Sequence, residues 1–259
     1  NATKMSKYLI KHNKEYIAEL KLGVKTDTAD GEGKVIAEKQ VNLEEIFENI
    51  NESIQQILNS FVGKTLQKPP MYSAIKVNGK KLYEYARKNE KVEVKSRQIE
   101  IYKMELIKLD LKENIIKFKV RCSKGTYIRT LCEDIAEKLN TYGYMKELQR
   151  TEVGDFKIEN AITIGELEEL VNENKLKDKI NEEALNIVNS KDRKYFIKIE
   201  ELFMDKKIIN LDEDLLNKFL NGVMIKNNNI DGIYRIYNKN NYIGIGVNKN
   251  QKLKRDVIV

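Results

Sequence analysis

Tyr127 and Arg129 are two reactive side chains that stand close enough in the sequence to act at one site. They stand two apart where residues 125–139 begin a predicted helix, on opposite sides of its apolar stripe of Ile128, Leu131, Cys132, Ile135, Ala136 and Leu139. A helix N-terminus carries free N–H groups and a positive dipole end, which suits a carboxylate or a phosphate. The other candidates are Asp27, Asp30 and Asp134. A tyrosine beside an apolar stripe also packs well in a core, and aspartates in turns are usually surface residues, so these residues alone specify no reaction.

The histidine and cysteine content argues against several classes of enzyme. The chain has one histidine, His12, which is too few for a His-rich metal site and argues against a Ser-His-Asp triad. Cys122 and Cys132 are too few for a thiolate zinc site or a disulfide framework, and they fit a reducing cytoplasm. No apolar run approaches the ~18 residues of a membrane span, and no Gly-rich fingerprint for a redox cofactor is present. We therefore expect a cytoplasmic protein without a His-rich or thiolate metal site and without a bound redox cofactor.

The positive charge is concentrated in one segment. The 259-residue chain has a formal net charge of +7, and residues 64–103 contain eleven basic residues against four acidic ones. Tyr72, Tyr83, Tyr85 and Tyr102 are interleaved with these charges. A lysine-rich proteome would also produce solvated basic faces, but it would spread the charge along the chain. A local basic excess with aromatic residues is typical of a polyanion-binding surface, so we predict that this segment binds nucleic acid.

The predicted helices and strands around these residues form a mixed α/β pattern with many strands. Residues 16–24 and 34–41 are predicted to pair around the acidic turn 26–33, which lacks the ligand order of a calcium loop. Asn42 and Glu45 have the capping-box spacing for one helix that reaches about residue 60. Residues 97–111 and 114–123 alternate as a second strand pair.

Two features separate further segments from this core. Pro69 and Pro70 hold the backbone extended and cannot join a central sheet, and Asn78-Gly79 predicts a tight turn, so the basic segment is an excursion. After a helix that Thr163 and Glu166 would cap, residues 171–194 are polar and charged, and strands return from about residue 195. The last strands are predicted to form a hairpin around Asn240-Asn241. We therefore expect two domains, 1–192 and 193–259.

Four stretches of the sequence also carry a family resemblance. They are NATKMSKYLIKHNKEYIAELKLGVKTDTADGEG (1–33), KPPMYSAIKVNGKKLYEYAR (68–87), CSKGTYIRTLCEDIAEKL (122–139) and ELQRTEVGDF (147–156). The third contains KGTYIRT, and in order and spacing the four resemble the TruB family of bacterial tRNA pseudouridine synthases. The resemblance implies an α+β pseudouridine synthase fold, with a mixed, largely antiparallel sheet, flanking helices and an RNA-binding insertion at 64–96. From FLNGVMI (219–225) onward the chain resembles the family's small β-rich, PUA-like RNA-binding domain.

The resemblance also implies an activity and residue roles. The family isomerises uridine 55 of the tRNA T-loop to pseudouridine without metal or cofactor, by flipping out the base and attacking covalently with an aspartate. Tyr16 matches the tyrosine that stacks on the flipped base, and Tyr127 the second pocket tyrosine, proposed to help take a proton from C5. Arg129 matches the arginine paired with the nucleophile, and Leu148 a leucine that bounds the uridine. The contacts with the T-arm would come from Lys68, Tyr72, Lys76, Lys80, Lys81 and Arg87.

The family's nucleophile motif, G-T-L-D-P, has no match in this sequence. The prolines are Pro69 and Pro70, so no Asp-Pro pair exists, and Leu109-Asp110 and Leu211-Asp212 lack the flanking glycine or threonine. The motif lies just upstream of the family segment that residues 1–33 resemble. We therefore expect that the chain lacks the N-terminal segment with the nucleophile, binds T-arm RNA and forms no pseudouridine.

Three functions remain open at this point. The first is a monomeric tRNA uridine-55 pseudouridine synthase, and the second is a non-catalytic RNA-binding or tRNA-folding protein. The third, an RNA-guided synthase of the archaeal and eukaryotic type, is disfavoured because the insertion at 64–96 resembles the stand-alone bacterial form. The motif match further predicts that Arg129 lines an open cavity with Tyr16, Tyr127 and Leu148, with Glu133, another carboxylate or solvent as its partner.

Overall fold

The computed structural model describes residues 2–9, 12–88, 90–173 and 197–259. The chain forms two compact units, Lys11–Glu159 and a second one that combines Asn1–Ile10 with Asn160–Val259. The predicted domain boundary between residues 192 and 193 lies outside the described residues.

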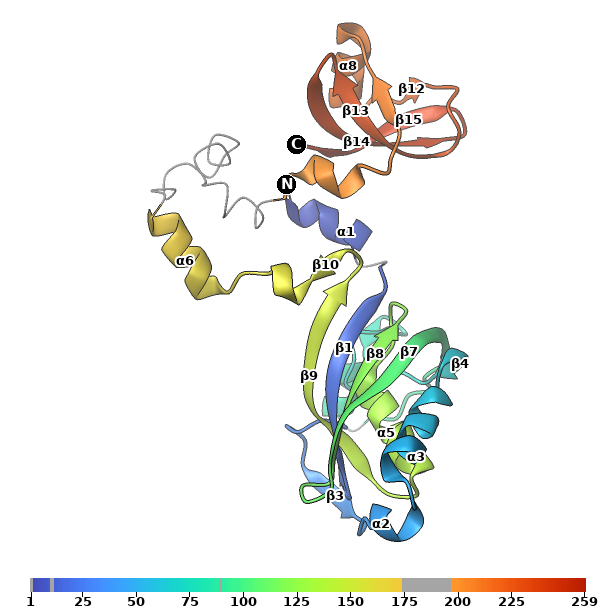
Figure 1. Cartoon of the computed structure of the whole chain (residues 1–259). Helices are drawn as coiled ribbons and strands as arrows, with labels where there is room; N and C mark the ends of the chain where they lie inside the picture. The colour runs from blue at the N-terminus through green and yellow to red at the C-terminus, as the bar shows by residue number, and fades with distance from the viewer. Residues whose placement is uncertain (1, 10–11, 89, 174–196) are drawn as a thin grey trace. The chain divides into compact units, whose positions relative to one another are not determined.

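The first unit is built on a six-stranded sheet in which all neighbouring strands pair antiparallel. Its order, visible in Figure 1, is β10 (Phe156–Lys157), β9 (Gly143–Val153), β1 (Lys14–Leu22), β8 (Ile115–Cys122), β7 (Arg97–Asp110) and β4 (Gly63–Gln67). The predicted strands 97–111 and 114–123 are therefore confirmed. Asn114, at φ +51°, lies in the turn that joins them.

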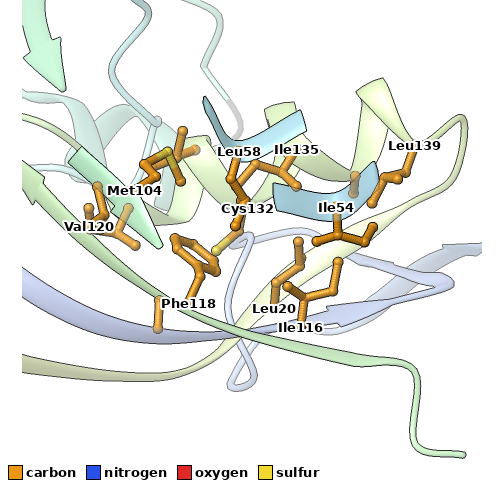
Figure 2. Packing of buried hydrophobic residues seen from close by; sticks show 14 of the residues in the cluster. Leu20, Ile54, Leu58, Met104, Ile116, Phe118, Val120, Cys132, Ile135 and Leu139 are labelled. Carbon is orange, nitrogen blue, oxygen red and sulfur yellow. The ribbon is translucent and has the colours of Figure 1, made fainter. Parts of the chain in front are cut away.

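Two helices, α3 (Ile50–Asn59) and α5 (Ile128–Lys138), cover one face of this sheet. In Figure 2 the sheet side chains Leu20 and Phe118 point toward Leu58 of α3 and toward Cys132 and Ile135 of α5, and all five are fully buried. The predicted apolar stripe of α5 is thus the face that the helix buries. Alternate residues of the same strands face the other way and carry ion pairs such as Glu19–Lys117. The sheet is therefore apolar on its helix side and charged on its other side.

The single helix predicted for residues 42–60 is wrong, because two helices occupy that stretch. They are α2 (Leu43–Ile46) and α3. Asn42 makes no side-chain capping bond, whereas the Asn49 side chain accepts a hydrogen bond from the Glu52 amide and begins α3. The sequence contained two candidate caps, and the second starts the longer helix.

A hairpin around the acidic turn is present, but the prediction that residues 16–24 form its first strand is wrong, because that stretch is mostly β1, which pairs with β8 and β9. Gly23, at φ +90°, ends β1, and β2 (Val24–Thr26) then pairs antiparallel with β3 (Val35–Glu38). In the basic segment, β5 (Lys76–Val77) and β6 (Lys80–Lys81) meet at the predicted Asn78-Gly79 turn, where both residues have positive φ. The helix α4 (Leu82–Arg87) follows directly.

The second unit contains a five-stranded, β-rich sheet. Its order is β11 (Ile208–Asn210), β13 (Gly232–Asn238), β14 (Asn241–Lys249), β15 (Lys252–Ile258) and β12 (Ile225–Lys226). The pair β11–β13 is parallel, and the others are antiparallel. The predicted last hairpin is present, but its turn lies at Lys239-Asn240, one residue earlier than expected, with Lys239 at φ +55°.

The short helices of this unit complete it. Among the described residues they include η1 (Ala2–Met5), α1 (Ser6–Leu9), α6 (Ile164–Glu173), η5 (Ile199–Phe203) and α8 (Glu213–Leu220). Met5 is buried against Phe203, Ile245 and Val257, which explains why the first ten residues belong to this unit. The capping box of Thr163 and Glu166 before α6 is confirmed by reciprocal hydrogen bonds. In the part of the chain that the structure describes, no helix is long and apolar enough to cross a membrane.

Candidate active site

The first turn of α5 places Tyr127 and Arg129 at the end of strand β8. After Cys122 the chain makes a turn in which the Thr126 hydroxyl donates to the Ser123 carbonyl at 3.0 Å, and Gly125 has φ +81°. Tyr127 is the N-cap residue of α5, with an extended backbone at φ −96° and ψ 110° and no side-chain capping bond. The burial of the stripe that begins at Ile128 fixes how the helix is rotated, and therefore where Arg129 points.

Arg129 connects three segments that are far apart in the sequence. Its Nη1 donates to the carboxylate Oδ2 of Asp30 at 2.9 Å and to the Thr28 carbonyl at 3.3 Å. Its Nη2 donates to the Tyr72 carbonyl at 2.7 Å. The side chains of Arg129 and Asp30 are 22% and 23% exposed, so the ion pair is largely shielded from solvent. Of the three partners that the sequence left open, another carboxylate is the one found, and Glu133 is not the partner in the ion pair.

The acidic turn holds Asp30 in position for this contact. Its Oδ1 accepts from the Thr28 hydroxyl at 2.6 Å and from the Glu32 amide at 3.3 Å, which leaves Oδ2 to Arg129. Asp27 caps the same turn by accepting from the Lys34 amide at 2.8 Å. Gly33 is required for this compact form, since a Cβ there would lie 2.2 Å from the Thr28 hydroxyl and 2.7 Å from Asp27 Oδ1. Among the described residues, no three His, Cys, Asp or Glu side chains gather as a metal site.

Tyr16 and Leu148 lie together on neighbouring strands. Tyr16 is paired with Arg150 and Ala18 with Leu148 between β1 and β9, so all four point to the face of the sheet that the helices cover. Ala18 is fully buried, but Leu148 is 41% exposed and Tyr16 is half-buried, so the helices leave this corner of the face open. Burial is the main cause that raises the pKa of Tyr16; the thiol of Cys122 adds to it, and the charge and hydrogen bond of Arg150 oppose it. Arg150 was not among the predicted site residues, although it belongs to the ELQRTEVGDF stretch.

Tyr16 and Leu148 are connected to Tyr127 and Arg129 through the backbone. Tyr16 pairs with Val120 on β8, and β8 leads through the turn at 123–126 to Tyr127. That Tyr16, Tyr127, Arg129 and Leu148 line one cavity stays a prediction.

The basic segment contacts the site through the Tyr72 carbonyl, which accepts from Arg129, and it carries several exposed charges. Lys68, Lys76, Lys80 and Arg87 are exposed, whereas Tyr72 and Lys81 are partly buried. Lys81 and Arg87 both lie over the ring of Tyr83, at 5.3 and 5.2 Å from its centre, and Lys80 lies 5.7 Å from that of Tyr85. Such cation–π contacts orient the cations without neutralising them. Tyr83 and Tyr85 thus hold cations of the basic segment in place, and the interleaving of tyrosines with basic residues was the signal in the sequence.

Asp134, the remaining candidate, lies on α5 away from the Arg129 ion pair. Burial raises its pKa from 3.8 to about 6, and the neighbouring carboxylates of Glu133 and Glu137 add to this shift. The raised pKa of Asp134 therefore reflects its burial first and its acidic neighbours on the same helix second, and Arg129 is not among its causes.

Comparisons with known proteins match almost the whole chain. Residues 1–128 match the family model described as TruB family pseudouridylate synthase (N terminal domain). Residues 129–190 match the tRNA pseudouridylate synthase B C-terminal domain, and residues 208–254 match Pseudouridine synthase II TruB, C-terminal. The protein named tRNA pseudouridine synthase B from Caldanaerobacter subterraneus subsp. tengcongensis is 40% identical over 256 residues, which is 98% of this chain and 80% of the relative. The chain belongs to the TruB family.

Further comparisons agree with this membership. The tRNA pseudouridine synthase B of Clostridium kluyveri is 39% identical over 260 residues, again covering 98% of this TruB-family chain and 80% of the relative. A chain of a solved Cbf5–Nop10–Gar1 complex superposes with a TM-score of 0.59 at 20% identity, over 95% of this chain and 63% of that chain. A chain of an archaeal box H/ACA Nop10–Cbf5 complex gives 0.59 at 18% identity, over 100% of this chain and 70% of that chain. The predicted pseudouridine synthase fold, mixed and largely antiparallel with a β-rich C-terminal part, is therefore confirmed.

Proposed function

We propose that this TruB-family protein is a tRNA pseudouridine synthase that isomerises uridine 55 of the T-loop, as a cytoplasmic monomer without metal or cofactor. Relatives at 39–40% identity carry the name tRNA pseudouridine synthase B. The observation that carries the proposal is the geometry at the start of α5, where a shielded Arg129 is held by Asp30 and two carbonyls, two residues after Tyr127.

Arg129 has the hydrogen-bonding capacity that the reaction requires. A guanidinium has five N–H groups, and three are used in the contacts with Asp30, Thr28 and Tyr72. Two donors are then left to bind a second carboxylate as a fork. A guanidinium in forked contact with a carboxylate keeps that carboxylate ionised and oriented for attack. Because Asp30 and the two carbonyls fix the guanidinium, the carboxylate needs no reorganisation when it reacts.

The reaction itself is an isomerisation, in which no atom is gained or lost overall. The bond between N1 of the uracil and the sugar C1′ breaks, the carboxylate takes part covalently, and the base turns so that C5 bonds to C1′. The proton on C5 must then leave, and N1 must regain one. We assign proton removal to the Tyr127 hydroxyl, stacking on the flipped base to Tyr16, and the apolar boundary of the uridine to Leu148. Stacking of this kind is worth about 1–3 kcal/mol per base, which offsets the cost of flipping.

The basic segment binds the T-arm in this proposal. Lys68, Lys76, Lys80 and Arg87 are exposed and reach phosphates, whereas Lys81 and Tyr72 support them from partly buried positions. Phosphate contacts position the RNA, and the shape of the T-loop with its splayed bases supplies the selectivity.

A non-catalytic RNA-binding function is the second candidate, and one observation favours it. The 259 residues contain no Asp-Pro pair and hence no match to the nucleophile motif of the family. Asp30 is the carboxylate that Arg129 binds among the described residues, and it is already engaged by its own turn.

One experiment separates the two candidates. The 259-residue chain and the product of the complete gene are incubated side by side with an unmodified tRNA transcript, and pseudouridine is mapped at single-nucleotide resolution. We expect the complete product to form pseudouridine at position 55 and the 259-residue chain to bind the tRNA without forming it. A transcript with cytidine at position 55 is the control. Binding by both proteins with no product from either would establish the non-catalytic function instead.

A further inference from the structure

Gln67 contacts the candidate site through two side-chain hydrogen bonds to Tyr127, and the proposed chemistry gives this contact no role. It is the last residue of β4 and is 5% exposed. Its Oε1 accepts a hydrogen bond from the Tyr127 amide at 2.8 Å, and its Nε2 donates to the Tyr127 carbonyl at 3.0 Å. A backbone N–H can only donate and a carbonyl can only accept, so the two contacts also fix which end of the side-chain amide is the oxygen.

We propose that Gln67 is a positioning residue that sets the orientation of Tyr127; this proposal rests on the function proposed above for Tyr127. Tyr127 is an N-cap residue whose own side chain makes no capping bond, so its φ and ψ are not fixed by a helix. The paired contacts from Gln67 imitate one rung of a β-ladder and hold that backbone on both sides. Because the Tyr127 side chain is attached at this Cα, a change in the Tyr127 backbone angles moves its hydroxyl relative to the flipped uracil.

The same contacts tie the basic segment to α5. Gln67 precedes Lys68-Pro69-Pro70-Met71, and Tyr72, the next residue, is held through its carbonyl by Arg129. Both ends of this short segment are therefore attached to the first turn of α5, one at Tyr127 and the other at Arg129. The two prolines restrict the backbone between these attachments. A displacement of the basic segment therefore shifts both Tyr127 and Arg129.

A purely structural role is the competing explanation, because buried backbone groups at a helix start need partners in any protein. Gln55 provides a matched control in the same unit. Its Oε1 accepts from the Leu106 amide at 2.7 Å and its Nε2 donates to the Met104 carbonyl at 3.2 Å, so it also joins a side-chain amide to a distant backbone. Gln55 connects α3 with β7 and contacts none of the proposed site residues.

The test compares Gln67→Met with Gln55→Met, each of which keeps an unbranched chain and removes both backbone contacts. Steady-state kinetics on unmodified tRNA use the product of the complete gene, with urea unfolding measured in parallel. We expect both variants to lose stability, but Gln67→Met alone to lower kcat by roughly tenfold to a hundredfold, with KM changed less than about threefold, because a displacement of the order of 1 Å has costs of this size. Hydrogen exchange of a peptide covering residues 124–129 should speed up in Gln67→Met and stay unchanged in Gln55→Met.

Each other result counts against the proposal. A kcat for Gln67→Met within twofold of wild type, or an equal loss in Gln55→Met, would show that the contact is only structural. If Gln67→Met does not fold, Gln67→Glu replaces it, since the carboxyl group keeps the acceptor for the Tyr127 amide, and the same comparison applies. If the wild-type protein forms no pseudouridine, the proposed function fails, and unchanged exchange at residues 124–129 would separately refute the hold on Tyr127.

Discussion

Replacing Asp30 by asparagine tests how the site holds Arg129. The asparagine side chain has the same shape, and its oxygen can still accept from the Thr28 hydroxyl and the Glu32 amide, so the turn keeps its internal bonds. The substitution removes the charge-assisted bond to Arg129 at 2.9 Å. Such bonds contribute about 1.5–3 kcal/mol when shielded, and exposed pairs about 0.2–1 kcal/mol. With both side chains about a fifth exposed, we expect a loss of about 1–2 kcal/mol in the free energy of unfolding.

Asp27→Asn is the matched control in the same turn. Asp27 accepts from the Lys34 amide, a bond that asparagine can keep, and it is not the carboxylate that Arg129 binds among the described residues. We expect this variant to stay within about 0.5 kcal/mol of wild type. The assay is urea unfolding followed by far-UV circular dichroism, with hydrogen exchange to confirm that the change lies in residues 11–159. If Asp30→Asn and Asp27→Asn were equally stable, the Arg129–Asp30 ion pair would not contribute to stability, and the role given to Asp30 in holding the guanidinium would be wrong.

Two further predictions concern Asp134 and the basic segment. The folded-state pKa of Asp134, about 6, lies above its ordinary 3.8, so its contribution to stability is present below pH 3.8 and is lost as pH rises to about 6. Asp134→Asn should therefore stabilise the fold by about 1–2 kcal/mol at pH 7.5, after allowance for solvent screening, and by almost nothing at pH 4. Equal effects at both pH values in urea unfolding would contradict this. Binding of a T-arm stem-loop should weaken steeply as salt rises. The double variant Lys76→Ala, Lys80→Ala should flatten the slope of log K against log salt by about one for each phosphate that the protein no longer reaches. A slope equal to that of wild type in fluorescence anisotropy titrations would exclude these lysines from the interface.

Local patterns in the sequence were sufficient for much of the fold. The apolar stripe of α5 and the alternation of β7 and β8 report which side chains are buried, and burial is a property that each residue type expresses directly. The failure at residues 42–60 has a similar local origin. Asn42 and Asn49 both have helix-capping chemistry, and only packing of Ile54 and Leu58 against the sheet selects the second as the start of the long helix.

The contacts that build the site could not be predicted in the same way. Arg129 and Asp30 are 99 residues apart, and Gln67 and Tyr127 are 60 apart. Nothing in an acidic turn distinguishes an aspartate that faces a helix from one that faces water. The motif resemblance selected Arg129 and Tyr127 but named neither Asp30 as the partner nor Gln67, because those pairings depend on how the turn after β2, strand β4 and helix α5 come together in space.

The role proposed for Arg129 in forming pseudouridine at one nucleotide can be measured directly. The product of the complete gene, as wild type and as Arg129→Lys, is incubated with unmodified tRNA, and the modified positions are mapped. We predict stoichiometric pseudouridine at position 55 with the wild type and a rate at least about 100-fold lower with Arg129→Lys, since a lysine cannot bind Asp30, the Tyr72 carbonyl and a second carboxylate as a fork. Product at another position, or an Arg129→Lys variant as fast as wild type, would contradict the account.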